Sequence, residues 1–233
     1  MPLTRSEYAE SPKTSLIAFV SVGSLSGVEL PCAFTYFTSP GETFASLSAS
    51  FIERARQRTL KDAHIEYHVL DAAQVAGLRS AGAGRFDKAV CTMALMDMPE
   101  ITPMFSALSQ VLKPGGAFVF SITHPCFHTA AIRRFTEIYE EESGHSIVHS
   151  GVKVSSYLFP FARKTEGIMG QPEPQWFYHR PICVLFQAGF SAGFVVDGIE
   201  EPGFPDPGKA HAGIRWNDMP EIPPIMVVRM RLT

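Results

Sequence analysis

The residues best suited to chemistry lie in the short stretch "HPCFH", which holds His124, Cys126 and His128. Imidazole and thiol groups at this spacing could bind a metal ion, but the stretch offers no fourth ligand, so a metal site is not expected. The stretch directly follows the apolar run "AFVFSI", which places His124 at the carboxyl end of an expected strand. We therefore interpret His124 as a hydrogen-bond partner or proton acceptor for a substrate.

The stretch "VSVGSLSG", residues 20–27, has the pattern of a strand that runs into a glycine loop. Such a loop lets a nucleotide-like cofactor approach the backbone, because glycine has no side chain to collide with it. The same stretch could equally be an ordinary turn. The choice between the two depends on the elements around it.

The middle of the chain predicts a sheet with helices between its strands. "SASFIERARQRTL" predicts a helix, with Ser50 and Glu53 at the spacing of a capping box. "IEYHVLD" alternates apolar and polar residues and predicts a strand that stops at Asp71. "FDKAVCTMAL" predicts a further strand, buried on both faces if the sheet is parallel.

A helix and another strand follow at once. In "DMPEITPMFSALSQVLKPGG", Asp97 and Glu100 have the capping-box spacing, and apolar residues then recur at helical intervals. The apolar stripe comprises Ile101, Met104, Phe105, Leu108, Val111 and Leu112. The turn "KPGG" ends this helix, and "AFVFSI" begins the next strand. Strand, helix, tight turn and strand form the unit of a parallel sheet with right-handed crossovers.

The C-terminal third predicts one more helix, "RPICVLFQAGF", and two strands, "GFVVDGIEEP" and "IMVVRMRL". The connection between these strands is rich in proline and lacks a helical pattern, so an antiparallel closing strand is expected. Periodicity fades over residues 128–178. That region predicts an insertion over the carboxyl edge of the sheet, where open α/β sheets bind their ligands.

Composition limits the partners of the chain. Its 233 residues fit one α/β domain, and 45% of them are hydrophobic. The net charge of −3, without a basic block, argues against nucleic acid as a partner. The four cysteines form no CxxC pair, which favours a reducing cytoplasm. The uncharged run 14–28 is too short and too polar to span a membrane, so a buried strand is expected there, and the oligomeric state stays open.

Two long stretches resemble one enzyme family. "GRFDKAVCTMALMDMPEITPMFSALSQVLKPGGAFVFSITHPCF" resembles the second half of a class I S-adenosylmethionine-dependent methyltransferase, and "FYHRPICVLFQAGFSAGFVVDGIEEPGF" is similar to the family's later helix and strand. The resemblance covers roughly residues 48–233. It implies a single Rossmann-like, doubly wound domain over residues 1–233, with a mostly parallel seven-stranded sheet, an antiparallel last strand and residues 128–178 as a small substrate-capping insertion. It also implies S-adenosylmethionine as the cofactor.

The resemblance also places cofactor-binding residues. Asp71 would accept a hydrogen bond from the adenine amino group, with the backbone of Ala72 serving the ring nitrogen, although Asp71 could instead cap the next short helix. Cys91, Thr92 and Met93 would flank the sulfonium and its methyl group. Cys91 and Met93 could equally be ordinary core residues.

The motif "FYHRP" looks like the family's pocket-closing motif, which makes Tyr178, His179 and Arg180 candidates for substrate binding. His179 joins His124 as a candidate catalytic base, needed only where the nucleophile must lose a proton. Alternatively, Arg180 pairs with a surface acid and His179 caps a helix.

The resemblance fails in the cofactor loop. The family pattern, acidic-x-Gly-x-Gly-x-Gly, falls on Ser21, Gly23, Leu25 and Gly27, so that the acid and the central glycine are missing. Ser46 stands where the family has the acid that binds the ribose. Gly23, Gly27 and Ser46 remain the cofactor-binding candidates of this region.

All of these departures fall within residues 14–47. We interpret the segment as abnormal as a block, through a frameshift, a mis-spliced exon or a wrong gene model. The expected activity is methyl transfer to an oxygen, nitrogen or carbon of a small molecule. The alternative is an inactive methyltransferase-like binding or scaffold protein. A nicotinamide oxidoreductase is disfavoured because GxGxxG and its distant acid are missing.

Overall fold

The computed structural model describes residues 16–20, 42–46, 48–59, 65–72, 75–80, 82–166, 173–204 and 214–233. Its strands are β1 (Leu16–Val20), β2 (Glu42–Ser46), β3 (Ile65–Val69), β4 (Phe86–Thr92), β5 (Leu112–Thr123), β6 (Arg133–Glu140), β7 (Ser146–Lys153), β8 (Phe161–Thr165), β9 (Gln175–His179), β10 (Phe194–Glu200) and β11 (Ile225–Leu232). Its helices are α1 (Ala49–Arg58), α2 (Val75–Ser80), α3 (Thr102–Val111) and α4 (Ile182–Phe190), with short 3₁₀ turns at Leu95–Asp97 (η2) and Trp216–Asp218 (η3).

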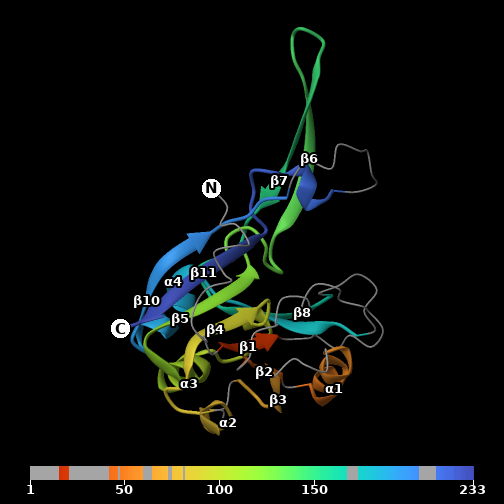
Figure 1. Ribbon diagram of the computed structural model, residues 1–233. Helices are drawn as coiled ribbons and strands as arrows, with labels where there is room; N and C mark the ends of the chain where they lie inside the picture. Colours follow the sequence, from red (N-terminus) through yellow and green to blue (C-terminus); the bar gives the residue numbers. More distant parts are fainter. Residues whose placement is uncertain are drawn as a thin grey trace, which may run out of the picture.

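The centre of the molecule is a seven-stranded sheet with the order β10-β11-β5-β4-β1-β2-β3 (Figure 1). Strands β1 to β5 run parallel to one another, while β11 runs antiparallel to both β5 and β10. Such a sheet, with helices between its parallel strands, is the α/β Rossmann-like arrangement. The segment 14–47 supplies two of the strands, β1 and β2, in the middle of this sheet.

Helices cover both faces of the sheet. Adjacent residues of β2 take part in different clusters: Phe44 packs with Phe51 and Ile52 of α1, whereas Ala45 belongs to the main core. Since neighbouring residues of a strand point to opposite faces, α1 and the main core lie on opposite sides of the sheet. The main core includes the buried stripe of α3, which comprises Met104, Phe105, Ala107, Leu108 and Val111. The expected apolar face of this helix is therefore confirmed.

Both predicted capping boxes are wrong. Helix α1 begins one residue before Ser50, and its N-cap is Ser48, whose hydroxyl accepts a hydrogen bond from the Phe51 amide at 3.2 Å. Helix α3 does not begin at Asp97 but at Thr102. The residue before a proline avoids the helical conformation, and the backbone at Met98 is extended, with ψ at 126°. The chain therefore makes a separate turn, η2, before the helix.

Strand β3 ends at Val69, two residues before the expected end at Asp71. The "KPGG" segment lies within the bounds of β5, where Gly115 adopts a φ of +75°. Glycine allows this left-handed conformation because it has no Cβ. In the last strand, Met226, Val228, Met230 and Leu232 are buried. The expected alternation of that strand is confirmed.

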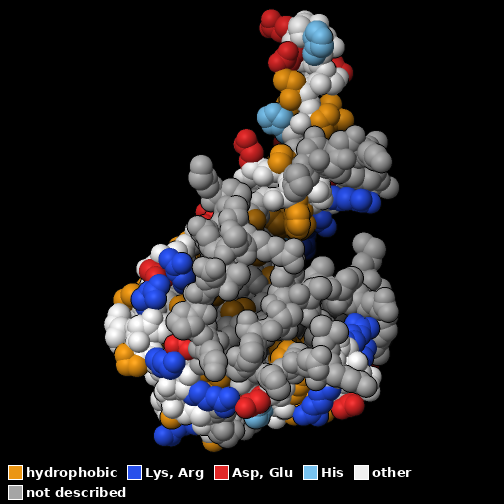
Figure 2. Space-filling model, in the orientation of Figure 1, with side chains coloured by type: hydrophobic (Ala, Val, Ile, Leu, Met, Phe, Trp, Pro, Cys, Tyr) orange, Lys and Arg blue, Asp and Glu red, His pale blue; other side chains and the backbone are white. Residues whose placement is uncertain are grey.

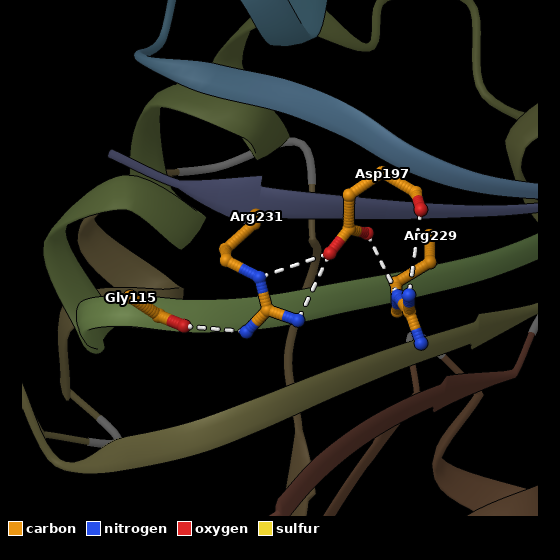
Figure 3. Close-up of polar contacts among 4 residues, drawn as sticks. All are labelled: Gly115, Asp197, Arg229 and Arg231. Carbon is orange, nitrogen blue, oxygen red and sulfur yellow. Dashed lines mark hydrogen bonds and ion pairs between the residues drawn. The ribbon is translucent and has the colours of Figure 1, made fainter.

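An ionic cluster ties the antiparallel strand β11 to both of its neighbours (Figure 3). A bulge in β10 between Val196 and Gly198 accompanies Asp197, whose carboxylate accepts hydrogen bonds from the Nε atoms of Arg229 and Arg231, at 2.7 and 2.9 Å. Arg231 also donates to the carbonyl of Gly115 in β5, at 3.1 Å. The hydrogen bond from Arg229 contributes most to a lowered pKa of Asp197. The cluster is exposed, so it contributes to strand order more than to stability.

Two hairpins occupy most of the expected insertion, residues 128–178, and the second extends to His179. Strands β6 and β7 pair with each other, as do β8 and β9, and neither pair joins the main sheet. The β6–β7 hairpin projects from the body of the molecule (Figure 1), whereas β9 packs against η2. The two hairpins therefore meet different surroundings.

Candidate functional site

The carboxyl ends of the parallel strands meet at one edge of the sheet. Ser46, the last residue of β2, is level with Val69 of β3, and Thr92, the last residue of β4, is level with Val20 of β1 and Ser121 of β5. Ligands of open α/β sheets bind beyond such an edge. The residues that follow these ends therefore form the candidate site.

The β2 and β3 ends carry two of the predicted cofactor residues. Ser46 is buried, and its hydroxyl oxygen accepts a hydrogen bond from the Ser48 amide at 3.2 Å. Among the described residues, the Ser46 hydroxyl has no acceptor for its own proton. Asp71 follows β3 by two residues and is partly exposed, and Ala72 beside it is buried. The expected loop residues Gly23 and Gly27 lie outside the described residues.

The backbone turns sharply after β4. Met93 has a φ of +48°, the left-handed region that non-glycine residues rarely adopt. Its amide donates to both the carbonyl oxygen and the hydroxyl of Ser121, at 3.0 and 3.2 Å. Unusual backbone held in this way is concentrated at functional sites. Thr92 next to it is exposed.

Cys91 belongs to the hydrophobic core and is fully buried. Burial raises the pKa of its thiol to about 12. A protonated, buried thiol is neither a nucleophile nor a charged ligand. Of the two roles considered for Cys91, the contacts favour core packing.

His124, directly after β5, has both ring nitrogens engaged. The Cys126 amide donates to Nδ1 at 3.1 Å, so the ring proton sits on Nε2, which donates to Glu201 Oε1 at 2.7 Å. The imidazole is buried, while the carboxylate of Glu201 is 52% exposed. This arrangement links the end of β5 to the segment after β10. It leaves no lone pair on the ring for a substrate proton.

Arg180 joins the end of β9 to the segment that follows β4. Its guanidinium donates to the carbonyls of Leu95 at 3.2 Å, Pro99 at 2.7 Å and Met98. Beside it, Gln175 donates to the Asp97 carboxylate at 3.3 Å. The terminal nitrogens of Arg180 are therefore occupied by backbone carbonyls, which gives the side chain a positioning role. Arg180 thus bonds to backbone carbonyls and not, as the alternative held, to the carboxylate of a surface acid.

His179 ends β9 and is 2% exposed. Its Nε2 donates to the carbonyl of Tyr157 at 2.8 Å, and its ring stacks on Phe161, with centroids 4.8 Å apart. Burial lowers the pKa of His179, so the ring is neutral at pH 7 and Nδ1 keeps a lone pair. The hydroxyl of Tyr157 accepts a hydrogen bond from the Ile182 amide at 3.1 Å, and so caps helix α4 in place of His179.

Tyr178 is the remaining substrate-binding candidate of the "FYHRP" motif. Its ring stacks with that of Trp176 at 6.3 Å, and the guanidinium of Arg180 lies 5.8 Å from its centre. His128, by contrast, donates to the carbonyl of Pro224 at 3.2 Å and packs on Trp216. Among the described residues, no three side chains suited to metal binding gather together. Within the same residues, no helix combines the length and apolar character that a membrane span requires.

The structure thus brings Ser46, Asp71, Thr92, Met93 and His124 to one edge of the sheet. Arg180 bonds the end of β9 to the segment after β4, whereas Tyr178 contacts Trp176 and Arg180, and His179 contacts Tyr157 and Phe161. Sequence reasoning missed Ser121, Glu201 and the hydroxyl of Tyr157. The two acids at the end of the expected strand "GFVVDGIEEP" were a usable signal for Glu201, whereas no local signal indicates the other two.

Residues 21–120 match the sequence model of a protein family that is described as a methyltransferase domain. No curated protein sequence matches the chain. An S-adenosylmethionine-dependent methyltransferase from Mesorhizobium loti is 20% identical, with a TM-score of 0.65, and covers 97% of this chain and 95% of its own.

A structure described as a putative S-adenosylmethionine-dependent methyltransferase from Listeria monocytogenes is 17% identical, with a TM-score of 0.65 and coverage of 96% and 94%. The glycopeptide N-methyltransferase MtfA in complex with S-adenosylmethionine is 15% identical, with a TM-score of 0.54 and coverage of 98% and 92%. At these identities the structural likeness shows a shared fold.

Proposed function

We propose that the chain is a class I S-adenosylmethionine-dependent methyltransferase, which transfers a methyl group from this cofactor to an oxygen, nitrogen or carbon of a small molecule. The methyltransferase domain model over residues 21–120 and the fold shared with solved methyltransferases support this proposal. The observation that carries the proposal is the edge of the sheet. There, the ends of adjacent parallel strands bring Ser46, Asp71 and Met93 together. Net charge supports a substrate other than nucleic acid.

The described residues fit S-adenosylmethionine at this edge. Asp71 supplies a carboxylate for the adenine amino group, and the backbone of Ala72 supplies a partner for the ring. Ser46 has one hydroxyl proton left for the ribose. Thr92 and Met93 follow β4, where the left-handed turn at Met93 exposes backbone in place of a continued strand. When bound, the cofactor supplies an electrophilic methyl group on a sulfonium.

The protein's own residues would chiefly orient the reactants. In-line displacement depends on position, and proton removal matters only for a nucleophile that carries a proton. Of the two histidines, His179 is better suited as a proton acceptor, because its Nδ1 keeps a lone pair, whereas His124 has both nitrogens engaged. We assign His124 and Arg180 to positioning, of β5 and of the segment after β4.

The second candidate function is a methyltransferase-like protein that binds the cofactor weakly or not at all. Ser46 favours it, since a hydroxyl at the end of β2 replaces the carboxylate that would accept from both ribose hydroxyls. Loss of such charge-assisted hydrogen bonds costs about 2–5 kcal/mol. Sequencing the transcript tests whether segment 14–47 is genuine. An in-frame message that encodes these residues would rule out a frameshift, a mis-spliced exon or a wrong gene model.

Calorimetric titration with S-adenosylhomocysteine tests the proposed function. We expect measurable binding by the wild-type chain and a dissociation constant about 10- to 100-fold weaker for Asp71→Ala, the cost of a hydrogen bond to a charged group. Glu142→Ala is the matched control, since it removes an exposed carboxylate in the turn between β6 and β7, outside the main sheet. Absence of heat from the wild-type chain at millimolar ligand would support the inactive scaffold. Equal affinity of Asp71→Ala and wild type would reject the role of Asp71.

A further inference from the structure

The β6–β7 hairpin, called the arm below, consists of residues 133–153. Its two strands form a sheet of their own and pair with no other strand among the described residues. Figure 1 shows the arm projecting from the body, and Figure 2 shows apolar side chains along it and acidic ones at its tip. A two-stranded hairpin standing alone is marginally stable in water. An arm of this length therefore gains from a partner surface.

The arm has two faces, because residues paired across the strands point to the same side. The Tyr139 face comprises the pairs Arg133–Lys153, Phe135–Gly151, Glu137–His149 and Tyr139–Ile147. The Ile138 face comprises the pairs Arg134–Val152, Thr136–Ser150, Ile138–Val148 and Glu140–Ser146.

The polar groups of the Tyr139 face satisfy one another. Glu137 accepts hydrogen bonds from the Tyr139 hydroxyl at 2.6 Å and from Lys153 at 3.2 Å. The ring of His149 meets that of Tyr139 edge-on at 5.5 Å. Closer to the body, the ring of Phe135 lies so near Gly151 that a Cβ there would come within 2.8 Å of it. The polar groups of this face are thus engaged within the arm, and its apolar pair, Tyr139 and Ile147, is 50% and 38% exposed.

The Ile138 face carries an apolar pair that the arm does not cover. Ile138 is 68% exposed and Val148, opposite it, is 61% exposed. The neighbouring pair is small and neutral, with the hydroxyls of Thr136 and Ser150 2.9 Å apart. Exposed apolar side chains gathered on one side of a strand pair mark an interaction surface.

The charges of the Ile138 face point to the occupant. Arg134 lies at its base and Glu140 at its tip. Arg134 is exposed; one terminal nitrogen donates to the Ile214 carbonyl at 2.8 Å, and the guanidinium lies 5.9 Å from the centre of the Trp216 ring. A guanidinium has five N–H donors, so others remain for a carboxylate. Glu140 is exposed as well. A face that is cationic at one end, apolar in the middle and anionic at the other end is complementary to itself when turned end for end.

We propose that two copies of this chain associate through their Ile138 faces, with the arms stacked antiparallel about a two-fold axis level with residue 137. Arg134 of each copy then faces the partner's Glu140, and Ile138 packs on the partner's Thr136. The Tyr139 face does not allow this arrangement, because the same axis would set Glu137 against the partner's Glu137. The inference does not rest on the proposed methyl transfer.

Sedimentation equilibrium from about 1 μM to about 1 mM chain tests the proposal. We expect a monomer–dimer equilibrium that weakens as salt is added, since the charge pairs are exposed. Arg134→Glu and Glu140→Arg each place like charges at both ends of the interface. Each is expected to raise the dimer dissociation constant about tenfold or more. The double variant R134E/E140R restores both charge pairs with their signs exchanged and is expected to dimerise like the wild type.

Arg133→Glu is the matched control, because it makes the same change of charge one residue away, on the Tyr139 face. Ile138→Ser is a second probe of the apolar centre and should also weaken the dimer. Circular dichroism melts establish that each variant is folded. A wild-type chain that stays monomeric up to about 1 mM overturns the proposal. The proposal is also overturned if both single charge reversals leave the dimer dissociation constant unchanged, or if the double variant does not restore it to the wild-type value.

Discussion

Arg180 gives the sharpest test of how the segment after β4 is held. The substitution Arg180→Met keeps a long apolar stem but removes the guanidinium. Three carbonyls of the segment, those of Leu95, Met98 and Pro99, would then lose their donor. Arg180 is partly buried, and burial is the main cause of its lowered pKa, so water does not fully replace these bonds.

The expected cost follows from the number and kind of these bonds. A hydrogen bond from a charged donor contributes about 1.5–3 kcal/mol, and bonds that share one guanidinium do not add fully. We expect a loss of about 3 kcal/mol in the free energy of unfolding. For a domain of this size, that loss lowers Tm by about 6–12 °C. The stability of Arg180→Lys should lie between that of the wild type and that of Arg180→Met, because an ammonium is a point charge and lacks the planar fork of a guanidinium.

Urea unfolding followed by circular dichroism gives the free energy, and hydrogen–deuterium exchange of the peptide over residues 93–101 gives the local effect. Exchange in that peptide should rise in Arg180→Met. Arg79→Met is the control, since Arg79 is exposed and its side chain makes no hydrogen bond among the described residues. Stability within about 0.5 kcal/mol of the wild type, with unchanged exchange, would refute the positioning role of Arg180.

Two further predictions concern buried side chains. Burial lowers the pKa values of His128 and His179, so the unfolded chain binds protons first as the pH falls below about 6.5. The contribution of the two histidines to the free energy of unfolding should therefore be fully present above that pH. Below it, the free energy of unfolding should fall by at most about 1.4 kcal/mol per pH unit for each histidine. The variant H128Q/H179Q should show a shallower slope between pH 7.5 and 5.5 in urea titrations, and an equal slope would contradict the assignment. Cys91, with a pKa of about 12, should resist iodoacetamide at pH 8 in the folded chain while exposed Cys183 reacts, as read by peptide mass spectrometry, and rapid native labelling of Cys91 would count against its burial.

Patterns of hydrophobic residues predicted most of the architecture. The stripe from Met104 to Val111 and the alternation from Met226 to Leu232 indicated a helix and a strand with one buried face each, and the structure has them. These patterns are reliable because burial repeats at the period of the element itself. The proline-rich connection before the last strand indicated an antiparallel β11, which the structure contains.

Helix starts were predicted less well. Ser48 and Ser50 are both suitable N-cap residues, and in the structure Ser48 is the N-cap. At α3, the extended backbone at Met98 separates Asp97 from the helix, although the capping-box spacing is present. Cap spacing is a local signal, and competing local signals are decided by the surrounding packing.

The sequence alone determined that strands and helices alternate, that the chain resembles a methyltransferase, and that Asp71, Met93 and His124 follow expected strands. The tertiary structure decided what their neighbours are. It engaged both nitrogens of His124, which Glu201 reaches from the segment after β10, and it turned Arg180 towards the carbonyls after β4. The physical reason is that strand ends are set by periodicity, which is local, whereas hydrogen-bond partners come from residues distant in sequence.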